Sequence, residues 1–433
     1  KPNVEVGEFT KDTFTVTNNN APREIIAAYY SDEKGVAKSD GEYIAIEMKV
    51  GYYVGSPFVY EAKSGHNIWS EEFMVTISVA NGQTFTVNGV EQTGKLVEAN
   101  MINERICPEI DAFKKGTATG YWTGKNDGDK VTIQTASYTP DSVTKDAVHN
   151  PLIIWLHGGG EGGTDIDIAL LGNEVSALVR EEIQNQFTTD GGNKGAYVFT
   201  AQTPTAWMDS GTTQMNGGQD SIYRDVLTKA IHDYVASNPD IDTRSIYIGG
   251  CSNGGYMTMS LMVHDGDFYA AAFPVCEAYS NELLTDEDVI ALAGKNIWFV
   301  QAMKDGVVKP MTLAIPTYQR LLQAGAQNCW FSMFENVVGM DDAGKSYNAH
   351  WSWIGLFNNQ VTHAQDPARI INGTKNDNYG FTPTNEGGGT IAPHGYNTLF
   401  SWLNAQSRGV AKSGEDFSLD FTTELFGNNV LVF

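Results

Sequence analysis

One serine of this chain lies in a sequence that suits a nucleophile. Ser252 is the central residue of Gly250-Cys251-Ser252-Asn253-Gly254, which fits the pattern G-x-S-x-G. In a nucleophile elbow this pattern lets the backbone turn sharply at the serine, between a strand and a helix, so that the hydroxyl is held exposed. Glycine suits both flanks because a Cβ atom there would crowd the neighbouring backbone. Ser252 is therefore the candidate nucleophile of an acyl-transfer reaction.

The residues around Ser252 decide how much weight this pattern carries. Alone it is weak evidence, because the chain has 45 glycines in 433 residues and the pattern can arise by chance. Residues 246–248 form a short β-prone apolar run, and residues 256–263 are mostly apolar and fit a helix buried beneath the turn. A strand, a serine turn and a helix are what an elbow needs. A glycine-serine turn without chemistry is the alternative.

A serine of this kind needs an acid and a base. A base must remove the hydroxyl proton, and a carboxylate must orient that base. In this arrangement the acid follows the serine and the histidine comes last. Asp305 comes just after the apolar run 297–302, so we expect it at the carboxyl end of a strand. Asp341 and Asp342, beyond the next expected strand, are the alternative acids.

Three of the eight histidines follow Asp305, namely His350, His363 and His394. His350 lies in Tyr347-Asn348-Ala349-His350-Trp351, a loop entered after the last expected core strand. His394 precedes the closing helix expected at residues 398–406 and is the alternative base. Position in a loop alone does not separate a catalytic role of His350 from a structural one.

A glycine-rich segment supplies candidate donors for an oxyanion. His157-Gly158-Gly159-Gly160 directly follows the apolar run 151–156. Glycines let backbone N–H groups approach a developing charge, so we expect donors at Gly159 and at Asn253, the residue after the serine. His157 is interpreted as a residue that fixes the loop. A phosphate loop is the competing interpretation of residues 158–163, but no Gly-Lys-Ser/Thr follows.

Two patterns of secondary structure divide the chain. Residues 1–115 contain short β-prone segments separated by turn clusters, which predicts an all-β immunoglobulin-like sandwich domain. In residues 116–433, strands alternate with helical patterns, which predicts a mainly parallel sheet covered by helices on both faces. The expected strands are residues 12–17, 24–30, 43–50, 58–61, 73–79 and 84–87 in the first domain and 130–138, 151–156, 197–200, 246–248, 271–275, 297–302 and 330–334 in the second.

Composition excludes several classes of partner. The net charge of −24 argues against binding to nucleic acid or to an anionic membrane surface. No run of 18 apolar residues occurs, so no membrane span is expected. The chain begins at Lys1 without an apolar leader, and we expect a mature protein that is secreted or extracytoplasmic. The four cysteines, Cys107, Cys251, Cys276 and Cys329, lack metal-like or disulfide-framework spacing. Cys251 and Cys276 lie near the ends of two expected strands and could approach each other, but buried free thiols are the favoured interpretation.

Taken in order, these segments resemble a known family. Leu156 to Gly163, Gly250 to Gly255, Lys304-Asp305-Gly306-Val307-Val308 and His350-Trp351-Ser352-Trp353 resemble the motifs of α/β-hydrolase esterases. The chain looks similar to secreted bacterial esterases related to polyhydroxybutyrate depolymerases and feruloyl esterases, some of which carry an N-terminal immunoglobulin-like domain. The resemblance covers about residues 120–408. It departs from the usual pattern in the long Gly/Asn-rich segment 358–397.

The resemblance implies an α/β-hydrolase fold and a serine carboxylesterase. It implies Ser252 as nucleophile, Asp305 as acid and His350 as base, with backbone N–H groups at Gly159 and Asn253 holding the oxyanion. No metal or organic cofactor is expected. The substrate would be a small-molecule or polymer-attached ester, with a short-chain or hydroxycinnamoyl acyl group. Aromatic residues expected to border the pocket are Trp207, Trp351, Trp353 and Tyr256.

Two other functions stay open at this point. A peptidase of the prolyl-oligopeptidase type shares the elbow, although about 115 residues cannot build the propeller that such enzymes carry. A non-catalytic binding protein with a hydrolase fold is the other alternative, and the presence of serine, acid, histidine and donor loop argues against it. The front domain is expected to serve in packing or in the assembly of a homo-oligomer.

Overall fold

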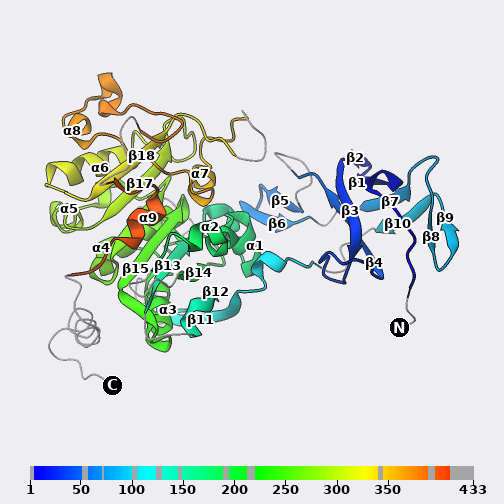
Figure 1. The fold of residues 1–433 in the computed structure, drawn as a ribbon. Helices are drawn as coiled ribbons and strands as arrows, with labels where there is room; N and C mark the ends of the chain where they lie inside the picture. Colours follow the sequence, from blue (N-terminus) through cyan, green and yellow to red (C-terminus); the bar gives the residue numbers. More distant parts are fainter. Residues whose placement is uncertain are drawn as a thin grey trace. The chain divides into compact units, whose positions relative to one another are not determined.

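The computed structural model describes residues 4–50, 57–70, 73–99, 105–122, 129–144, 149–188, 195–211, 220–339, 345–388 and 395–409. Two compact units can be distinguished, Lys1–Glu61 with Asn67–Asp111, and Ala62–His66 with Ala112–Phe433 (Figure 1). The division places β11 (Lys114–Trp122) wholly in the second unit. A domain boundary close to residues 111–115 is therefore our proposal, and the boundary expected after residue 115 stays a prediction.

The first unit is built from short antiparallel strands. Its largest sheet has the order β10-β7-β1-β2, and three two-stranded ladders, β3-β4, β5-β6 and β8-β9, accompany it. Phe14, Val79 and Phe85 form its buried core. This arrangement confirms the all-β class expected from the sequence. The strands are β1 (Phe14–Asn18), β2 (Ala21–Arg23), β3 (Ile25–Ser31), β4 (Tyr43–Met48), β5 (Phe58–Glu61), β6 (His66–Trp69), β7 (Val75–Val79), β8 (Phe85–Val87), β9 (Val90–Gln92) and β10 (Lys95–Ala99).

The second unit is organised around an eight-stranded sheet with the order β11-β12-β14-β13-β15-β16-β17-β18. The strands from β14 to β18 in that order run parallel, while β12 pairs antiparallel with both β11 and β14. Parallel strands end at one edge, so the loops that follow them meet there. The remaining strands are β12 (Asp129–Tyr138), β13 (Asn150–Leu156), β14 (Tyr197–Gln202), β15 (Ile241–Cys251), β16 (Ala271–Val275), β17 (Ile297–Ala302) and β18 (Cys329–Phe334).

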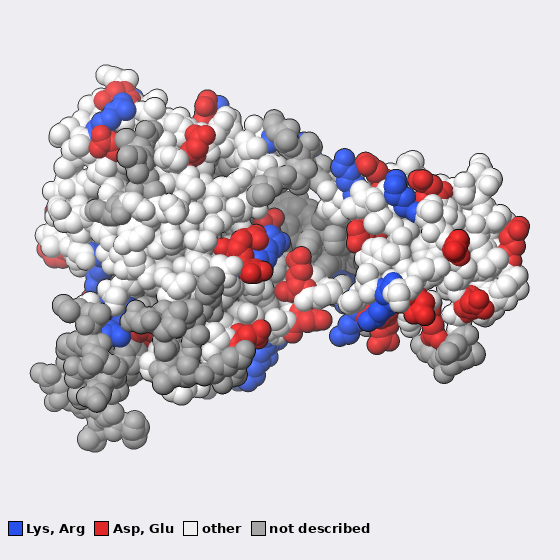
Figure 2. Space-filling view, in the orientation of Figure 1, with Lys and Arg blue, Asp and Glu red and all other residues white. Residues whose placement is uncertain are grey.

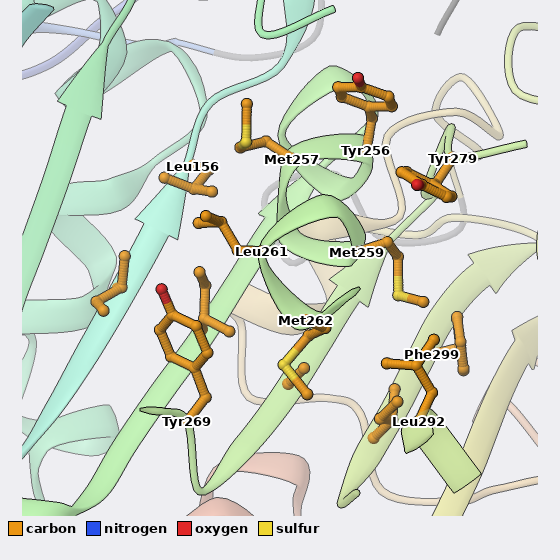
Figure 3. Close-up of a cluster of buried hydrophobic side chains, with 14 of the residues drawn as sticks. Leu156, Tyr256, Met257, Met259, Leu261, Met262, Tyr269, Tyr279, Leu292 and Phe299 are labelled. Atoms are coloured by element: carbon orange, nitrogen blue, oxygen red, sulfur yellow. The ribbon is translucent and has the colours of Figure 1, made fainter. Parts of the chain in front are cut away.

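Strands β13 and β14 and strands β16 and β17 are buried along their whole length, because both faces of the sheet are covered. On one face, Ile154, Ile248 and Phe299 join a core with residues of the helices α3 (Arg224–Ser237), α4 (Asn253–Asp265), α5 (Asp286–Ala293) and α6 (Ala314–Gln323). Figure 3 shows this packing around α4, with Met257 and Leu261 near Leu156 and with Met259 towards Phe299. Helix α4 is buried over most of its length and so forms a rigid base under its own N-terminus.

The opposite face carries a second aromatic layer. Trp155 of β13 packs against Phe273 of β16 at 5.8 Å between ring centroids and against Phe357 of α7 (Trp353–Phe357) at 4.8 Å. Trp298 of β17 lies 5.3 Å from Trp402 of α9 (Leu399–Asn404). Side chains alternate along a strand, so successive residues of β13 and β17 pack into the cores on opposite faces of the sheet. These layers confirm the α/β-hydrolase architecture expected from the sequence.

Figure 2 shows acidic side chains spread over the visible face beside lysines and arginines, as expected for a chain with a net charge of −24. None of the helices in the described part of the chain combines the length and the apolar character that a membrane span requires.

Candidate active site

Ser252 follows β15 and immediately precedes α4. Its backbone has φ 56° and ψ −113°, a conformation that a non-glycine residue adopts only under constraint. The constraint comes from close packing, because a Cβ atom at Gly250 would lie 2.6 Å from the Gly254 carbonyl and one at Gly254 would overlap the carbonyl oxygen of Leu156. The N–H of Ser252 donates to the carbonyl of Val275 at 2.9 Å. The strand, sharp turn and helix predicted around the serine are all present.

The two predicted oxyanion donors lie close together. A Cβ atom at Gly159 would be 4.0 Å from the Cβ of Asn253. Asn253 is the first residue of α4, where helical N–H groups have no partner within the helix. Within the described ranges, the backbone N–H groups of Gly159 and Asn253 donate to no protein acceptor. Both are therefore free to donate to a substrate oxygen.

Three residues fix the loop that carries Gly159. The ring of His157 accepts the Thr203 N–H on Nε2 at 3.1 Å and bonds through Nδ1 to the carbonyl of Gly158. Burial lowers the pKa of His157 to about 4, so the ring is neutral and structural, as the sequence interpretation expected. The side chain of Asn173 accepts the Gly158 N–H at 2.9 Å. Nothing in the sequence around Asn173 indicated this contact.

Asp305 and His350 form a direct pair. Asp305 Oδ2 accepts from His350 Nδ1 at 2.9 Å, while Asp305 Oδ1 accepts two backbone N–H groups, from Val307 and Val308, each at 2.9 Å. The Asp305 carboxylate is also close to the amide of Gln301, at 3.3 Å. The side chain of Asp305 is fully buried and that of His350 is 11% exposed. The structure thus holds one oxygen of the acid on backbone donors and points the other at the histidine.

A thiol is the second neighbour of the His350 ring. Cys276, directly after β16, is buried and has φ 36°. Burial tends to lower the pKa of His350, but Cys276 and Asp305 outweigh this effect through charge and hydrogen bonding, and the pKa lies above its usual 6.5. No hydrogen bond joins Ser252 and His350 within the described residues, and such bonds are often long in enzymes without substrate.

The other predicted candidates have varied placements. Asp341, Asp342 and His394, the alternative acids and base, lie outside the described residues. His363 is half-buried, and its Nδ1 is 2.9 Å from the hydroxyl oxygen of Thr362. Asp305 and His350 are therefore the predicted pair that the structure brings together.

The four predicted pocket aromatics separate into two groups. Trp207 is fully buried, and its ring donates through Nε1 to the carbonyl of His157 at 3.1 Å while its backbone N–H donates to the side chain of Asn253. Tyr256 is also buried. Trp351 and Trp353 are partly exposed, and Trp353 meets the His350 ring edge-on, 5.6 Å between centroids. The burial of Trp207 favours a role in positioning Asn253, and its contact with substrate stays a prediction.

Comparison with known proteins supports both units. Residues 2–93 match the model of the esterase Ig-like N-terminal domain, and residues 200–296 match that of the prolyl oligopeptidase family. No curated protein matched the chain. The crystal structure of a thermostable esterase is 21% identical, with a TM-score of 0.64 over 83% of this chain and 91% of that one. This likeness shows the fold.

Two further structures are more distant. A ferulic acid esterase is 12% identical over 57% of this chain and 95% of that one, with a TM-score of 0.40. A Pyrococcus horikoshii acylaminoacyl peptidase is 14% identical over 62% of this chain and 44% of that one, with a TM-score of 0.35. At these scores neither decides the substrate. Residues 2–93 are thus similar to the Ig-like N-terminal domain of esterases, and residues 200–296, within the α/β-hydrolase domain, are similar to the prolyl oligopeptidase family.

Proposed function

We propose that this α/β hydrolase is a serine carboxylesterase that works through an acyl-enzyme. The observation that carries the proposal is the 2.9 Å pair of Asp305 and His350 at the strand edge where Ser252 sits in an elbow conformation. The match of residues 2–93 to an esterase domain supports an ester as substrate.

Three side chains and two backbone N–H groups carry out the proposed reaction. Ser252 attacks the ester carbonyl while His350 accepts its proton, and Asp305 holds the imidazole in the required tautomer. The oxyanion of the tetrahedral intermediate accepts hydrogen bonds from the free N–H groups of Gly159 and Asn253. His350 then gives the proton to the leaving alcohol, and afterwards removes a proton from the water that hydrolyses the acyl-enzyme.

The aromatic residues beside His350 suggest the acyl group. Trp351 and Trp353 are partly exposed next to the base, so a flat hydroxycinnamoyl group can stack on them, whereas a short aliphatic acyl group uses little of that surface. We therefore propose feruloyl-type or short-chain esters, either as small molecules or attached to a polymer.

A serine peptidase is the second candidate, because residues 200–296 match the prolyl oligopeptidase family. An amine is a poorer leaving group than an alcohol and depends more on proton donation by the histidine. Ester and amide substrates with the same acyl group therefore separate the two activities. A non-catalytic hydrolase-fold protein would cleave neither substrate.

The direct test compares the wild type with Ser252→Ala and, as a matched control, Ser407→Ala, which changes an exposed serine. We expect hydrolysis of p-nitrophenyl butyrate by the wild type and by Ser407→Ala, and a loss of about 10⁶-fold in kcat for Ser252→Ala, as when a triad serine is removed. Faster cleavage of an N-acylated amino-acid p-nitroanilide than of the ester would favour the peptidase. Equal ester hydrolysis by Ser252→Ala would refute Ser252 as the nucleophile.

Two further proposals concern the setting of the enzyme. We infer a secreted or extracytoplasmic protein, supported by the esterase-type front domain, and a homo-oligomer formed through that domain. Sedimentation equilibrium of the full chain tests the second proposal, and a mass equal to one 47.2 kDa chain would overturn it.

A further inference from the structure

The active-site edge of the sheet brings together three side chains that can ligate a metal. Cys276, Asp305 and His350 each offer one ligand atom, and the three atoms lie within 4.8 Å of one another. All three residues are buried. The proposed hydrolysis uses two of them and leaves the thiol of Cys276 without a role.

The distances are close to those of a tetrahedral site. Zinc binds thiolate sulfur at about 2.3 Å and imidazole nitrogen or carboxylate oxygen at about 2.0–2.2 Å, which puts neighbouring ligand atoms about 3.3–3.8 Å apart. Asp305 Oδ2 and His350 Nδ1 are 2.9 Å apart, and no two ligand atoms are more than 4.8 Å apart. Shifts of up to about 1.5 Å, within the reach of side-chain rotations, therefore give this spacing.

Backbone contacts hold each of the three residues in place. The N–H of Cys276 donates to the Val300 carbonyl at 2.8 Å, and the N–H of His350 donates to the side chain of Asn348 at 3.0 Å. Asp305 keeps Oδ1 on two backbone donors and turns Oδ2 to the cluster. Little reorganisation is thus needed to bind an ion.

The donor set selects the kind of ion. A thiolate and an imidazole suit zinc, cobalt(II) or cadmium, whereas magnesium and calcium prefer oxygen ligands throughout. The sulfur that takes the cation is a thiolate, and any thiol proton passes to solvent on binding.

The geometry points to an inhibitory site for zinc-like divalent cations, made by Cys276, Asp305 and His350. His350 Nδ1 faces Asp305 Oδ2, so a cation shared with Asp305 takes the place of the Nδ1 proton, which passes to solvent. The neutral ring then carries its remaining proton on Nε2, and the lone pair that accepts the Ser252 proton is lost. The register supports this effect, because β15 and β16 pair Cys251 with Val275 and so place Ser252 and Cys276 next to each other at the strand ends. The inhibitory consequence depends on the proposed function, whereas the binding site does not.

Cobalt(II) titration of Ser252→Ala, which keeps the three ligands but lacks the proposed nucleophile, tests binding apart from catalysis. We expect one equivalent of cobalt to give the near-ultraviolet charge-transfer band of a cobalt–thiolate bond, and zinc to displace it. The band should disappear in Ser252→Ala/Cys276→Ala and remain in Ser252→Ala/Cys329→Ala, the matched control, whose buried thiol is on β18. No band in Ser252→Ala, or a band that survives loss of Cys276, would overturn the site.

Activity measurements supply the second test. In the active protein, we expect the zinc concentration for half-inhibition to rise by at least about 10–100-fold in Cys276→Ala, because even partners outside the ligand shell cost that much affinity. Cys276→Ser serves if the alanine variant fails to fold. Unchanged inhibition in the variant that folds would contradict the site. If Ser252→Ala keeps full esterase activity, the proposed function fails while the cobalt result still decides the site.

Discussion

Glu277, the residue after Cys276, should make the stability of the hydrolase domain fall as the pH rises. Its side chain is buried, with 1% of the residue exposed. Oε2 accepts the Tyr279 N–H at 2.6 Å, and Oε1 has no partner among the described residues. Helix α4 packs directly against it, since a Cβ atom at Gly255 would lie 2.7 Å from its Cα. Burial raises the pKa of Glu277 from 4.5 to about 8, partly offset by the Tyr279 hydrogen bond.

The sign and size of the effect follow from this pKa. Between pH 4.5 and about 8 the folded state holds a proton on Glu277 that the unfolded state has lost, so the free energy of unfolding falls as pH rises. Each pH unit costs about 1.4 kcal/mol, which amounts to roughly 3 kcal/mol at pH 7. Below pH 4.5 both states are protonated and the cost vanishes.

Glu277→Gln removes the titration and keeps the size and the acceptor of the side chain. The difference in unfolding free energy between a glutamine and a protonated glutamate at this position does not depend on pH. Any pH dependence of the difference in unfolding free energy between the variant and the wild type therefore comes from the ionisation of Glu277. We expect the variant to gain on the wild type by about 1.4 kcal/mol per pH unit above pH 4.5, with a plateau beyond about pH 8.

Urea unfolding of the full chain, followed by tryptophan fluorescence, measures this gap. Trp155, Trp207, Trp298 and Trp402 are fully buried in the hydrolase unit and report on its unfolding. Glu282→Gln, which changes an exposed acid in the same loop, is the matched control and should run parallel to the wild type at all pH values. Parallel behaviour of Glu277→Gln would refute the raised pKa.

Two further predictions concern the pair at the active site. Asp305→Asn keeps an oxygen that can accept the backbone N–H groups but loses the negative charge and the control of the His350 tautomer. The kcat for p-nitrophenyl butyrate should therefore fall by about 10⁴-fold. Retention of more than a tenth of the activity would exclude Asp305 as the acid. Cys276→Ala removes a group that raises the pKa of His350, so the acid limb of the kcat/KM profile should move to lower pH, because the base works only when deprotonated. Cys329→Ala should leave that limb in place, and an unmoved limb in Cys276→Ala would contradict the contact.

Strands with a strong apolar run were predicted from the sequence, and so was β12, which has no such run, whereas the edge strand β11 was not. β13, β16 and β17 lie within about a residue of the expected segments, because both faces of these strands are buried. β11 reads Lys-Lys-Gly-Thr-Ala-Thr-Gly-Tyr-Trp and has no such run. It is a strand because it pairs with β12 along nine residues at the edge of the sheet, and edge pairing leaves little trace in hydrophobicity.

The site shows the same division between local and long-range information. Ser252 was predicted from its motif and Asp305 from its place after a strand, because parallel strands deliver their following loops to one edge. His350 was singled out by the resemblance to α/β-hydrolase esterases. The contact between Cys276 and His350 could not be predicted, since it joins residues that lie far apart in the sequence and at no regular spacing. Asn173, which accepts the Gly158 N–H, and Gln301, which donates to Asp305, were not predicted either, because no periodicity in the sequence marks these side chains.

The backbone conformations of Ser252 and Cys276 depend on support from the core beneath the site. Both are non-glycine residues with positive φ, at neighbouring strand ends, and such conformations cost about 1–3 kcal/mol each. They persist because the turns are fixed from below, where α4 presents buried methionines and leucine to the sheet (Figure 3). The same packing that exposes the serine hydroxyl brings the thiol to the base. The thiol of Cys276 therefore lies beside His350 because Cys276 directly follows β16. Its effect on the pKa of His350 can be measured.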